Sequence, residues 1–338
     1  MVKGGSRTQK VNATIKSSYL WPYFKRFKLS KNLRANADAQ EFAKFVRNVG
    51  RGIPNSDEPE GYCRLPESVC TKESLTEKIF GSLMRNRDYS KINETAILAA
   101  LNKTVEDIND EVLDMLEENE RIFFAQDTTD TEHEATVMPD MLNSLRSAGL
   151  PPYKMRLKVN AVVMLLRNLN VAEGLCNGTR LQILEIGDRI LKVMILTGDK
   201  RGDTVLIPRI TVTDDQSFPF PIHRHQFPVK LAYAITINKA QGQTFKRLGI
   251  DITSPVFDHG QLYTALSRAP CWESITVRLP EDAVNTMVTN IVFEEVLDDE
   301  EESVMHDDEM PIEEEWISDE DINANGDSGN DVAMDVDV

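Results

Sequence analysis

Apolar residues recur along the chain with two different periods. Helical spacing marks residues 42–49, with Asp38 as a candidate N-cap and Gly52 as a stop. The short apolar run 96–101 has the length of a buried strand, and a turn at Asn102 leads to helical spacing over 104–116. The first third of the chain therefore predicts helices and one strand–turn–helix unit.

The pattern changes to short β-type runs between Met155 and Thr213. The runs "LKVNAVVMLL", "RLQILEI", "LKVMIL" and "TVLIPRI" are separated by turn sequences such as "NGT" and "TGDKRGD". Short strands with turn residues between them predict a small β-barrel. Residues 53–90 and 126–150 have the composition of loops.

The alternation of strand and helix returns after a Pro-rich link at 217–228. Residues 229–237, "VKLAYAITI", predict one apolar strand, and a strand at 248–252, a helix at 260–269 and a strand at 274–280 follow. Strands alternating with helices predict α/β layering.

The negative charge of the chain is concentrated at one end. The net charge is −17, yet 20 of the 55 acidic residues lie in 294–338, which has no Lys or Arg. The remaining 35 acidic residues face 38 basic ones, a net of +3, so a nucleic-acid partner is not excluded. Self-repulsion and few large apolar residues predict a disordered tail, most simply a solvated one without a specific role.

Metal and membrane chemistry have little support in the sequence. The four cysteines form no C-x-x-C pair, so inert thiols in an intracellular protein are expected and no metal site is predicted. No apolar run reaches the length of a membrane span, and the basic N-terminus is not followed by a signal-peptide core.

Four polar stretches carry the candidate chemistry. They are "LSKNLRA" (29–35), "AALNKTVEDIN" (99–109), "YAITINKAQGQT" (233–244) and "HGQLYTALSRA" (259–269). Amide and hydroxyl groups in "NKAQGQT" suit phosphate or sugar contacts. Each stretch alone is equally compatible with a polar loop or an ordinary amphipathic helix.

In order and spacing, the four stretches together resemble the C-terminal motor domain of superfamily-one DNA helicases of the Pif (petite integration frequency) family. "SSYLWPYFKRFKLSKNLRA" is similar to the segment ending in the family's L-x-x-N-x-R motif, and "LPPYKMRLKVNAVVMLLRNLNVAEGLCNGTRL" is similar to its inserted β-barrel segment. Asn238, where many relatives have His, favours the Helitron-like branch. Asn160-Ala161-Val162 departs from the usual Gly-Ala-Pro and puts one turn of the insertion in doubt.

The resemblance implies roles for individual residues. Two arginines would point at the γ-phosphate of ATP as catalytic fingers: Arg34 and Arg268. Three residues would bind the nucleotide cofactor: Gly242, Gln243 and Thr244. Of these, Gln243 and Thr244 would also couple nucleotide state to DNA grip. Four residues would lie near DNA: Asn102, Thr236, Asn238 and Lys239.

The implied fold class is α/β: a second RecA-like motor domain, with a parallel sheet and flanking helices, an inserted small β-barrel domain and a disordered acidic tail. The expected boundaries are 1–130 and 223–292 for the motor domain, 131–222 for the insertion and 293–338 for the tail. ATP and Mg²⁺ are the implied cofactors. Single-stranded or forked DNA and a first RecA-like domain are the implied partners of a monomer, in the nucleus or alternatively in mitochondria.

One expected motif is missing from the chain. A motor needs the phosphate-cradling P-loop G-x-x-x-x-G-K-[ST] and an acidic pair for Mg²⁺, and neither occurs in the 338 residues. We therefore expect the chain to be the C-terminal part of a helicase, acting in replication, repair, recombination or telomere maintenance and inactive alone. The alternatives are a non-catalytic nucleic-acid-binding remnant of a transposon-derived helicase and a folded remnant without function.

Overall fold

The computed structural model describes residues 5–25, 39–130, 138–147 and 149–297. Arg34, the candidate cap Asp38 and nearly all of the acidic tail lie outside the described residues. In the described part, no helix is long and apolar enough to cross a membrane.

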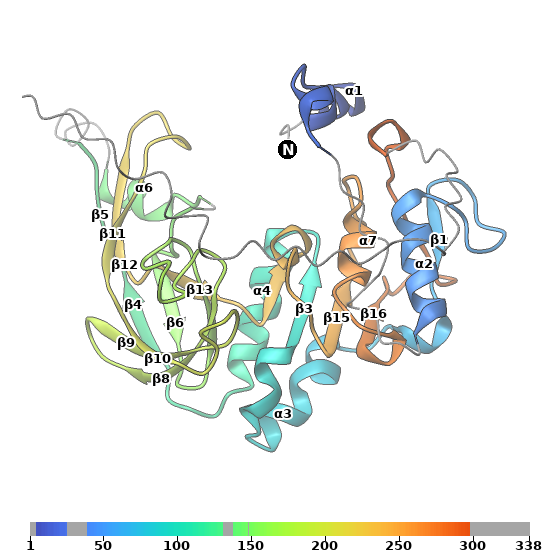
Figure 1. Cartoon of the computed structure of the whole chain (residues 1–338). Helices are drawn as coiled ribbons and strands as arrows, with labels where there is room; N and C mark the ends of the chain where they lie inside the picture. The colour runs from blue at the N-terminus through green and yellow to red at the C-terminus, as the bar shows by residue number, and fades with distance from the viewer. Residues whose placement is uncertain (1–4, 26–38, 131–137, 148, 298–338) are drawn as a thin grey trace, which may run out of the picture. The chain divides into compact units, whose positions relative to one another are not determined.

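A parallel sheet with helices packed against it is confirmed. Its strand order is β14 (Ala234–Thr236), β3 (Thr95–Ala99), β15 (Arg247–Asp251), β16 (Ile275–Arg278) and β2 (Cys70–Thr71), with every pair parallel (Figure 1). All five residues of β3 are buried, as expected for a strand covered on both faces.

The helices follow the predicted apolar stripes. Helix α4 (Asn102–Asp114) buries Val105, Ile108, Val112 and Leu113 and packs against β3 and β14. Helix α2 (Gln40–Arg51) packs against α7 (Gln261–Leu266) and ends at Gly52, whose φ of 72° is the left-handed conformation that glycine tolerates. Shorter helices are α1 (Arg7–Asn12), α3 (Ser82–Arg85) and α6 (Pro139–Ser144).

A second, antiparallel sheet contains the predicted short strands. Its order is β10 (Thr204–Pro208), β9 (Ile190–Ile195), β8 (Arg180–Ile186), β7 (Val162–Leu165) and β13 (Val229–Leu231). Among the described residues no pairing joins β10 to β13, so closure into a barrel stays a prediction.

Three smaller sheets complete the β structure. They are β11 (Ile210–Asp214), β12 (Ile222–Gln226) and β5 (Gln126–Thr128); β4 (Arg121–Phe124) with β6 (Lys154–Leu157); and β1 (Tyr62–Arg64) with β17 (Met287–Thr289). Apart from the antiparallel pair β1 and β17, the antiparallel strands run from Arg121 to Leu231, beyond both ends of the predicted insertion at 131–222.

The loop predictions at 53–90, 126–150 and 217–228 were wrong in part. The first segment contains β1, β2 and α3, the second contains β5 and α6, and the third contains β12. In β12, Arg224 is buried and its guanidinium forms a bidentate ion pair with Asp127 of β5, at 2.8 and 2.7 Å. A charged residue thus occupies a core position, and the hydrophobic pattern does not reveal the strand.

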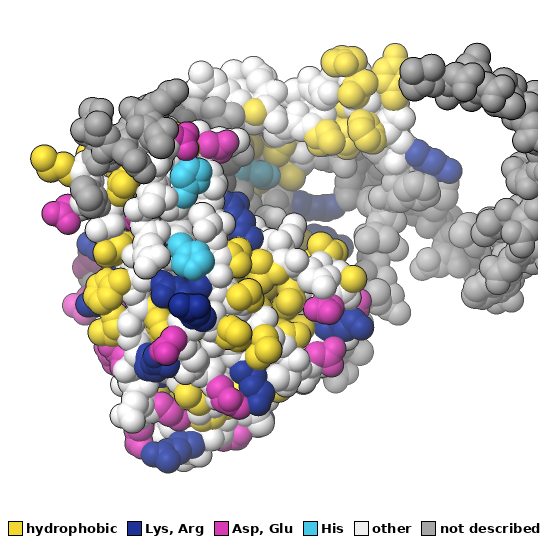
Figure 2. All heavy atoms as spheres, turned by 90° about the vertical axis from the view of Figure 1, so that its left-hand side faces the viewer, with side chains coloured by type: hydrophobic (Ala, Val, Ile, Leu, Met, Phe, Trp, Pro, Cys, Tyr) yellow, Lys and Arg dark blue, Asp and Glu magenta, His cyan; other side chains and the backbone are white. Residues whose placement is uncertain are grey.

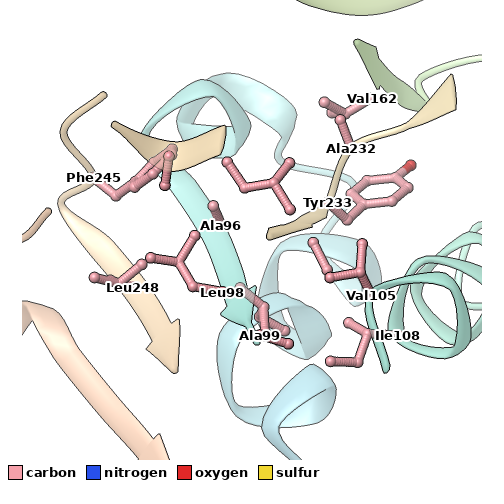
Figure 3. Close-up of a cluster of buried hydrophobic side chains, with 14 of the residues drawn as sticks. Ala96, Leu98, Ala99, Val105, Ile108, Val162, Ala232, Tyr233, Phe245 and Leu248 are labelled. Atoms are coloured by element: carbon pink, nitrogen blue, oxygen red, sulfur yellow. The ribbon is translucent and has the colours of Figure 1, made fainter. Parts of the chain in front are cut away.

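The predicted single strand at 229–237 is two strands in two different sheets. β13 ends at Leu231 in the antiparallel sheet, and β14 begins at Ala234 in the parallel sheet. Ala232 and Tyr233 are completely buried between them, beside Val162 of β7 (Figure 3). One continuous hydrophobic core therefore includes residues of both sheets.

Candidate nucleotide and nucleic-acid site

The predicted DNA-contacting residues follow the carboxyl ends of two neighbouring strands. Thr236 is the last residue of β14 and pairs with Ala99, the last residue of β3. Asn102 follows β3 and is exposed as the first residue of α4, where we had expected a turn. Asn238 and Lys239 are exposed in the short 3₁₀ helix Ile237–Ala240 that follows β14. Because the strands are parallel, these residues follow the same edge of the sheet.

Asn109 fixes this arrangement, and sequence reasoning missed it. Its side-chain carbonyl accepts the N–H groups of Tyr233 and Ala234, at 2.8 and 2.9 Å. Its amide donates to the carbonyl of Ala234 at 2.9 Å and to that of Val105 at 2.8 Å. This buried amide therefore ties the helix that begins at Asn102 to the strand that ends at Thr236.

Lys230 of β13 adds a second cation beside Lys239. Burial, together with the positive charge of Lys239, lowers the pKa of Lys230 to about 8, while Glu106 of α4 opposes the shift. Lys230 lies in the antiparallel sheet and Lys239 in the 3₁₀ helix after β14, so the fold rather than a local sequence pattern brings them together. Two neighbouring ammonium groups favour a negatively charged ligand at this edge.

The structure brings Arg268 to the loop that carries Gly242 and Gln243. Helix α7 ends at Leu266, so Arg268 lies in the turn beyond it rather than on the predicted helix. The guanidinium donates to the carbonyls of Ala240 and Gln243, at 3.4 and 3.3 Å. It also donates to the Thr264 carbonyl at 3.0 Å, and its side chain is buried. The two last helicase-like stretches therefore form one structural unit.

The other predicted nucleotide-coupling residues lie on the rim of this loop. Gly242 has a φ of 85°, and a Cβ at this position would have nothing within 4 Å, so the left-handed backbone rather than crowding requires glycine. Thr244 is exposed. The amide of Gln243 donates to the Lys239 carbonyl at 3.5 Å, while its buried Oε1 accepts no hydrogen bond from the described residues.

These groups fit the phosphate end of a nucleotide in chemical type. Arg268 supplies a fixed positive charge. Gln243 and Thr244 supply an amide and a hydroxyl, which are groups that bind phosphate oxygens in other proteins. A bound nucleotide would supply the phosphoanhydride bond whose cleavage drives a motor. The acceptors of Arg268 described above are backbone carbonyls, which orient the guanidinium.

Other candidate chemistry has less support. In the described part of the chain, no group of three His, Cys, Asp or Glu side chains could hold a metal ion, and the four cysteines are free. Burial raises the pKa of the Cys63 thiol to about 12 and that of Cys70 to about 11, so both thiols are unreactive near neutral pH. The outer face of the antiparallel strands mixes basic, acidic and apolar side chains without one continuous basic stripe (Figure 2).

Two family descriptions match the chain. Residues 1–60 match "PIF1-like helicase", and residues 140–186 match "DNA helicase Pif1, 2B domain". The second match covers α6 and the strands β6, β7 and β8, all in the antiparallel region.

Curated relatives are ATP-dependent DNA helicases. The chain is 30% identical over 214 residues to ATP-dependent DNA helicase PIF1 of Danio rerio, covering 60% of this chain and 30% of the relative. It is 31% identical over 216 residues to ATP-dependent DNA helicase Pif1 of Campylobacter jejuni, covering 60% of this chain and 47% of the relative. The chain thus spans less than half the length of these relatives.

Solved structures have the same fold. The crystal structure of Bacteroides Pif1 bound to ssDNA matches with a TM-score of 0.50 at 25% identity, covering 73% of this chain and 50% of that one. Pif1 helicase from Candida albicans matches with a TM-score of 0.53 at 21% identity, covering 78% and 59%. From the two family matches, the curated relatives and the shared parallel sheet, we conclude that this chain is similar to the Pif1-like helicases of superfamily one over the matched segments.

Proposed function

We propose that the chain is the part of an ATP-dependent DNA helicase that carries the second RecA-like motor domain and its inserted β domain. Asn102, Thr236, Asn238 and Lys239 contact the backbone of single-stranded or forked DNA. Arg268 and the Gln243 loop face ATP and Mg²⁺ held mainly by a first motor domain.

One observation carries the proposal. The segment 236–246 starts at the carboxyl edge of the parallel sheet, where Thr236 and Asn102 follow their strands, and ends at the amino edge, where the Lys246 N–H bonds to the Glu94 carbonyl at 2.9 Å. Arg268 packs on the middle of the same segment. A single short segment therefore connects the proposed DNA edge to the proposed nucleotide edge, as coupling between the two requires.

Exposed aromatic residues support a missing partner domain. Tyr19, Tyr23 and Phe24 are 83%, 84% and 51% exposed, and they immediately precede the segment that carries Arg34. Large apolar side chains grouped in this way favour a protein contact. We assign that contact to the first motor domain, with Arg34 directed at the nucleotide between the two.

Binding and hydrolysis by the purified chain test the proposal. Fluorescence anisotropy with labelled single-stranded DNA should show weak binding that falls as salt rises. Lys239→Ala should reduce the affinity, whereas Lys192→Ala, on the exposed side of β9, should not. The chain alone should show no DNA-stimulated ATP hydrolysis, because the P-loop is absent from its sequence. Equal effects of the two lysine variants would overturn the assignment of the DNA edge. DNA-stimulated hydrolysis by the chain alone would overturn the proposal that ATP is held mainly by a first motor domain.

A second candidate is a non-catalytic nucleic-acid-binding remnant of a transposon-derived, Helitron-like helicase. Adding the purified first motor domain of a relative distinguishes the two candidate functions. Restored ATPase activity that requires Arg268 supports the motor, and unchanged DNA binding without hydrolysis supports the remnant. Both proposals place the chain with DNA, in the nucleus or in mitochondria.

A further inference from the structure

Arg180 is a buried cation that the proposed function does not use. It begins β8 in the antiparallel region, directly after the turn sequence "NGT", and its side chain is fully buried. Its guanidinium donates to the Thr95 carbonyl at 2.9 Å and to the Asn93 carbonyl at 3.3 Å. Both carbonyls belong to the parallel-sheet region, so an arginine from one region is held by the backbone of the other.

The carbonyls need Arg180 because a neighbouring strand stops short of them. The Ile97 N–H bonds to the Tyr233 carbonyl, and β14 pairs with β3 from Ala234 onward. Continued two residues back, this register would bring the Tyr233 N–H to the Thr95 carbonyl. The chain instead leaves for the other sheet, where Ala232 bonds to Val162, and Asn109 accepts the Tyr233 N–H. Arg180 takes the place of the absent strand.

Arg180 also touches the loop that holds Arg268. Its guanidinium carbon lies 5.4 Å from the centre of the Phe245 ring, and Phe245 is 1% exposed. The Phe245 N–H donates to the Arg268 carbonyl at 2.9 Å, and Arg268 in turn donates to the Gln243 carbonyl. A chain of direct contacts thus runs from β8 through Phe245 to the proposed nucleotide-side residues.

We propose that Arg180 is a positioning residue, through which the inserted β domain holds the loop 241–245 and Arg268 in place. The role assigned to the loop rests on the proposed function, but the positioning contact does not. An apolar side chain would fill the same volume without the desolvation that an arginine suffers. The planar guanidinium is the group that can bond two carbonyls and stack on a ring at the same time.

Hydrogen exchange of the full chain, without DNA or nucleotide, tests the proposal. In Arg180→Met, the amides of residues 243–246 should exchange about tenfold faster, while amides of β9 and β16 should keep their rates. Arg180→Lys should show a smaller effect, because it keeps the charge but not the fork. Phe245→Leu should accelerate the same loop amides by removing the ring.

Arg209→Met is the matched control. Arg209 also lies over a phenylalanine ring, 5.6 Å from the centre of Phe227, and donates to a backbone carbonyl, that of Phe124 at 2.5 Å. It makes these contacts within the antiparallel region, so the loop amides should be unaffected.

Unchanged exchange at residues 243–246 in Arg180→Met, or equal acceleration throughout the chain, would overturn the proposal. If that variant does not fold, Arg180→Lys and Phe245→Leu decide by the same criterion. If the wild-type chain does not bind DNA, the proposed function is contradicted, but the hydrogen-exchange result for Arg180 still stands.

Discussion

At the scale of single residues, buried polar side chains hold neighbouring elements of the fold together. Asn109, Arg180 and Arg224 all occupy core positions and bond to backbone carbonyls or to a buried carboxylate. Sequence periodicity assigns such residues to solvent, because it counts only apolar positions. Asn109 stands in the predicted helix among acidic residues, and nothing in the sequence shows that it faces β14.

Asn109→Leu should destabilise the protein by about 3 kcal/mol or more, because two buried N–H groups and one carbonyl of β14 would lose their partner. Urea denaturation followed by circular dichroism measures the change. Asp107→Ala, an exposed position on the same helix, should change the stability by less than about 0.5 kcal/mol. Equal stability of the two variants would show that the amide is dispensable.

Lys230 should make the stability depend on pH in the alkaline range. Its pKa is lowered to about 8, below that of an unfolded lysine, so the unfolded chain binds more protons above that pH. The free energy of unfolding should therefore rise as pH increases from about 8 toward about 10. Lys230→Met should remove this rise, while Lys103→Met, an exposed lysine on α4, should retain it. A rise that persists in Lys230→Met contradicts the shifted pKa.

At the scale of elements, the packing of α2 on α7 positions the turn that carries Arg268. Gly50 lies in α2, and a Cβ added there would be 2.7 Å from Cδ2 of Tyr263 in α7. The aromatic rings of Phe42 and Phe45 also pack edge-on against Trp272, which follows the turn. Glycine is required at position 50 because the two helices approach closely there, and not because the chain has to be flexible.

Gly50→Ala should be destabilising by about 1–3 kcal/mol through overpacking, although alanine is the better helix former. Removing the ring should relieve the clash, so in Tyr263→Ala the same glycine substitution should be neutral or favourable. Thermal denaturation of the four proteins of this cycle gives the coupling between the two positions. An identical effect of Gly50→Ala in both backgrounds would show that the helices separate freely.

Element types were predictable where apolar spacing was regular, as in α2, α4, β3 and the strands from β7 to β10. Their assignment to sheets was not. The run 229–237 is apolar throughout, and periodicity cannot show where a chain leaves one sheet for another. The residues predicted at the two ends of the candidate site came from the family resemblance. Lys230 and Asn109 could not be predicted, because their roles depend on contacts made only in the fold. Asn109 and its partner Ala234 are over 100 positions apart in the sequence.

At the scale of the whole molecule, charge is divided between a nearly neutral folded part and an acidic end. Glu295 forms a two-point ion pair with Arg7, at 3.1 and 2.8 Å, so the acidic segment begins with a residue attached to α1. The hydrogen bond from Arg7 is the main cause of the lowered pKa of Glu295. A truncation that tests the acidic residues should therefore leave Glu295 in place.

Deleting residues 298–338 removes 18 of the 20 acidic residues that follow Phe293 and keeps Glu294 and Glu295. We expect affinity for single-stranded DNA to increase about tenfold at low salt, because the removed charges repel phosphates. The gain should shrink as salt rises, which titration at several ionic strengths measures. A deletion that leaves the affinity unchanged would show that the acidic segment and the DNA do not interact.

At Tyr233 the backbone changes its hydrogen-bond partners from one sheet to the other, and this limits how far the two sheets can be treated as separate modules. The antiparallel region supplies Arg180 to the edge of β3 beyond the start of β14, and only Ala232 and Tyr233 connect β13 to β14. Replacing residues 125–228 by a short linker would leave the carbonyls of Asn93 and Thr95 uncapped in the core. The antiparallel region therefore cannot be removed without disturbing the parallel sheet. A chimaera that exchanges it between relatives has to carry the arginine and its two carbonyl acceptors as one unit.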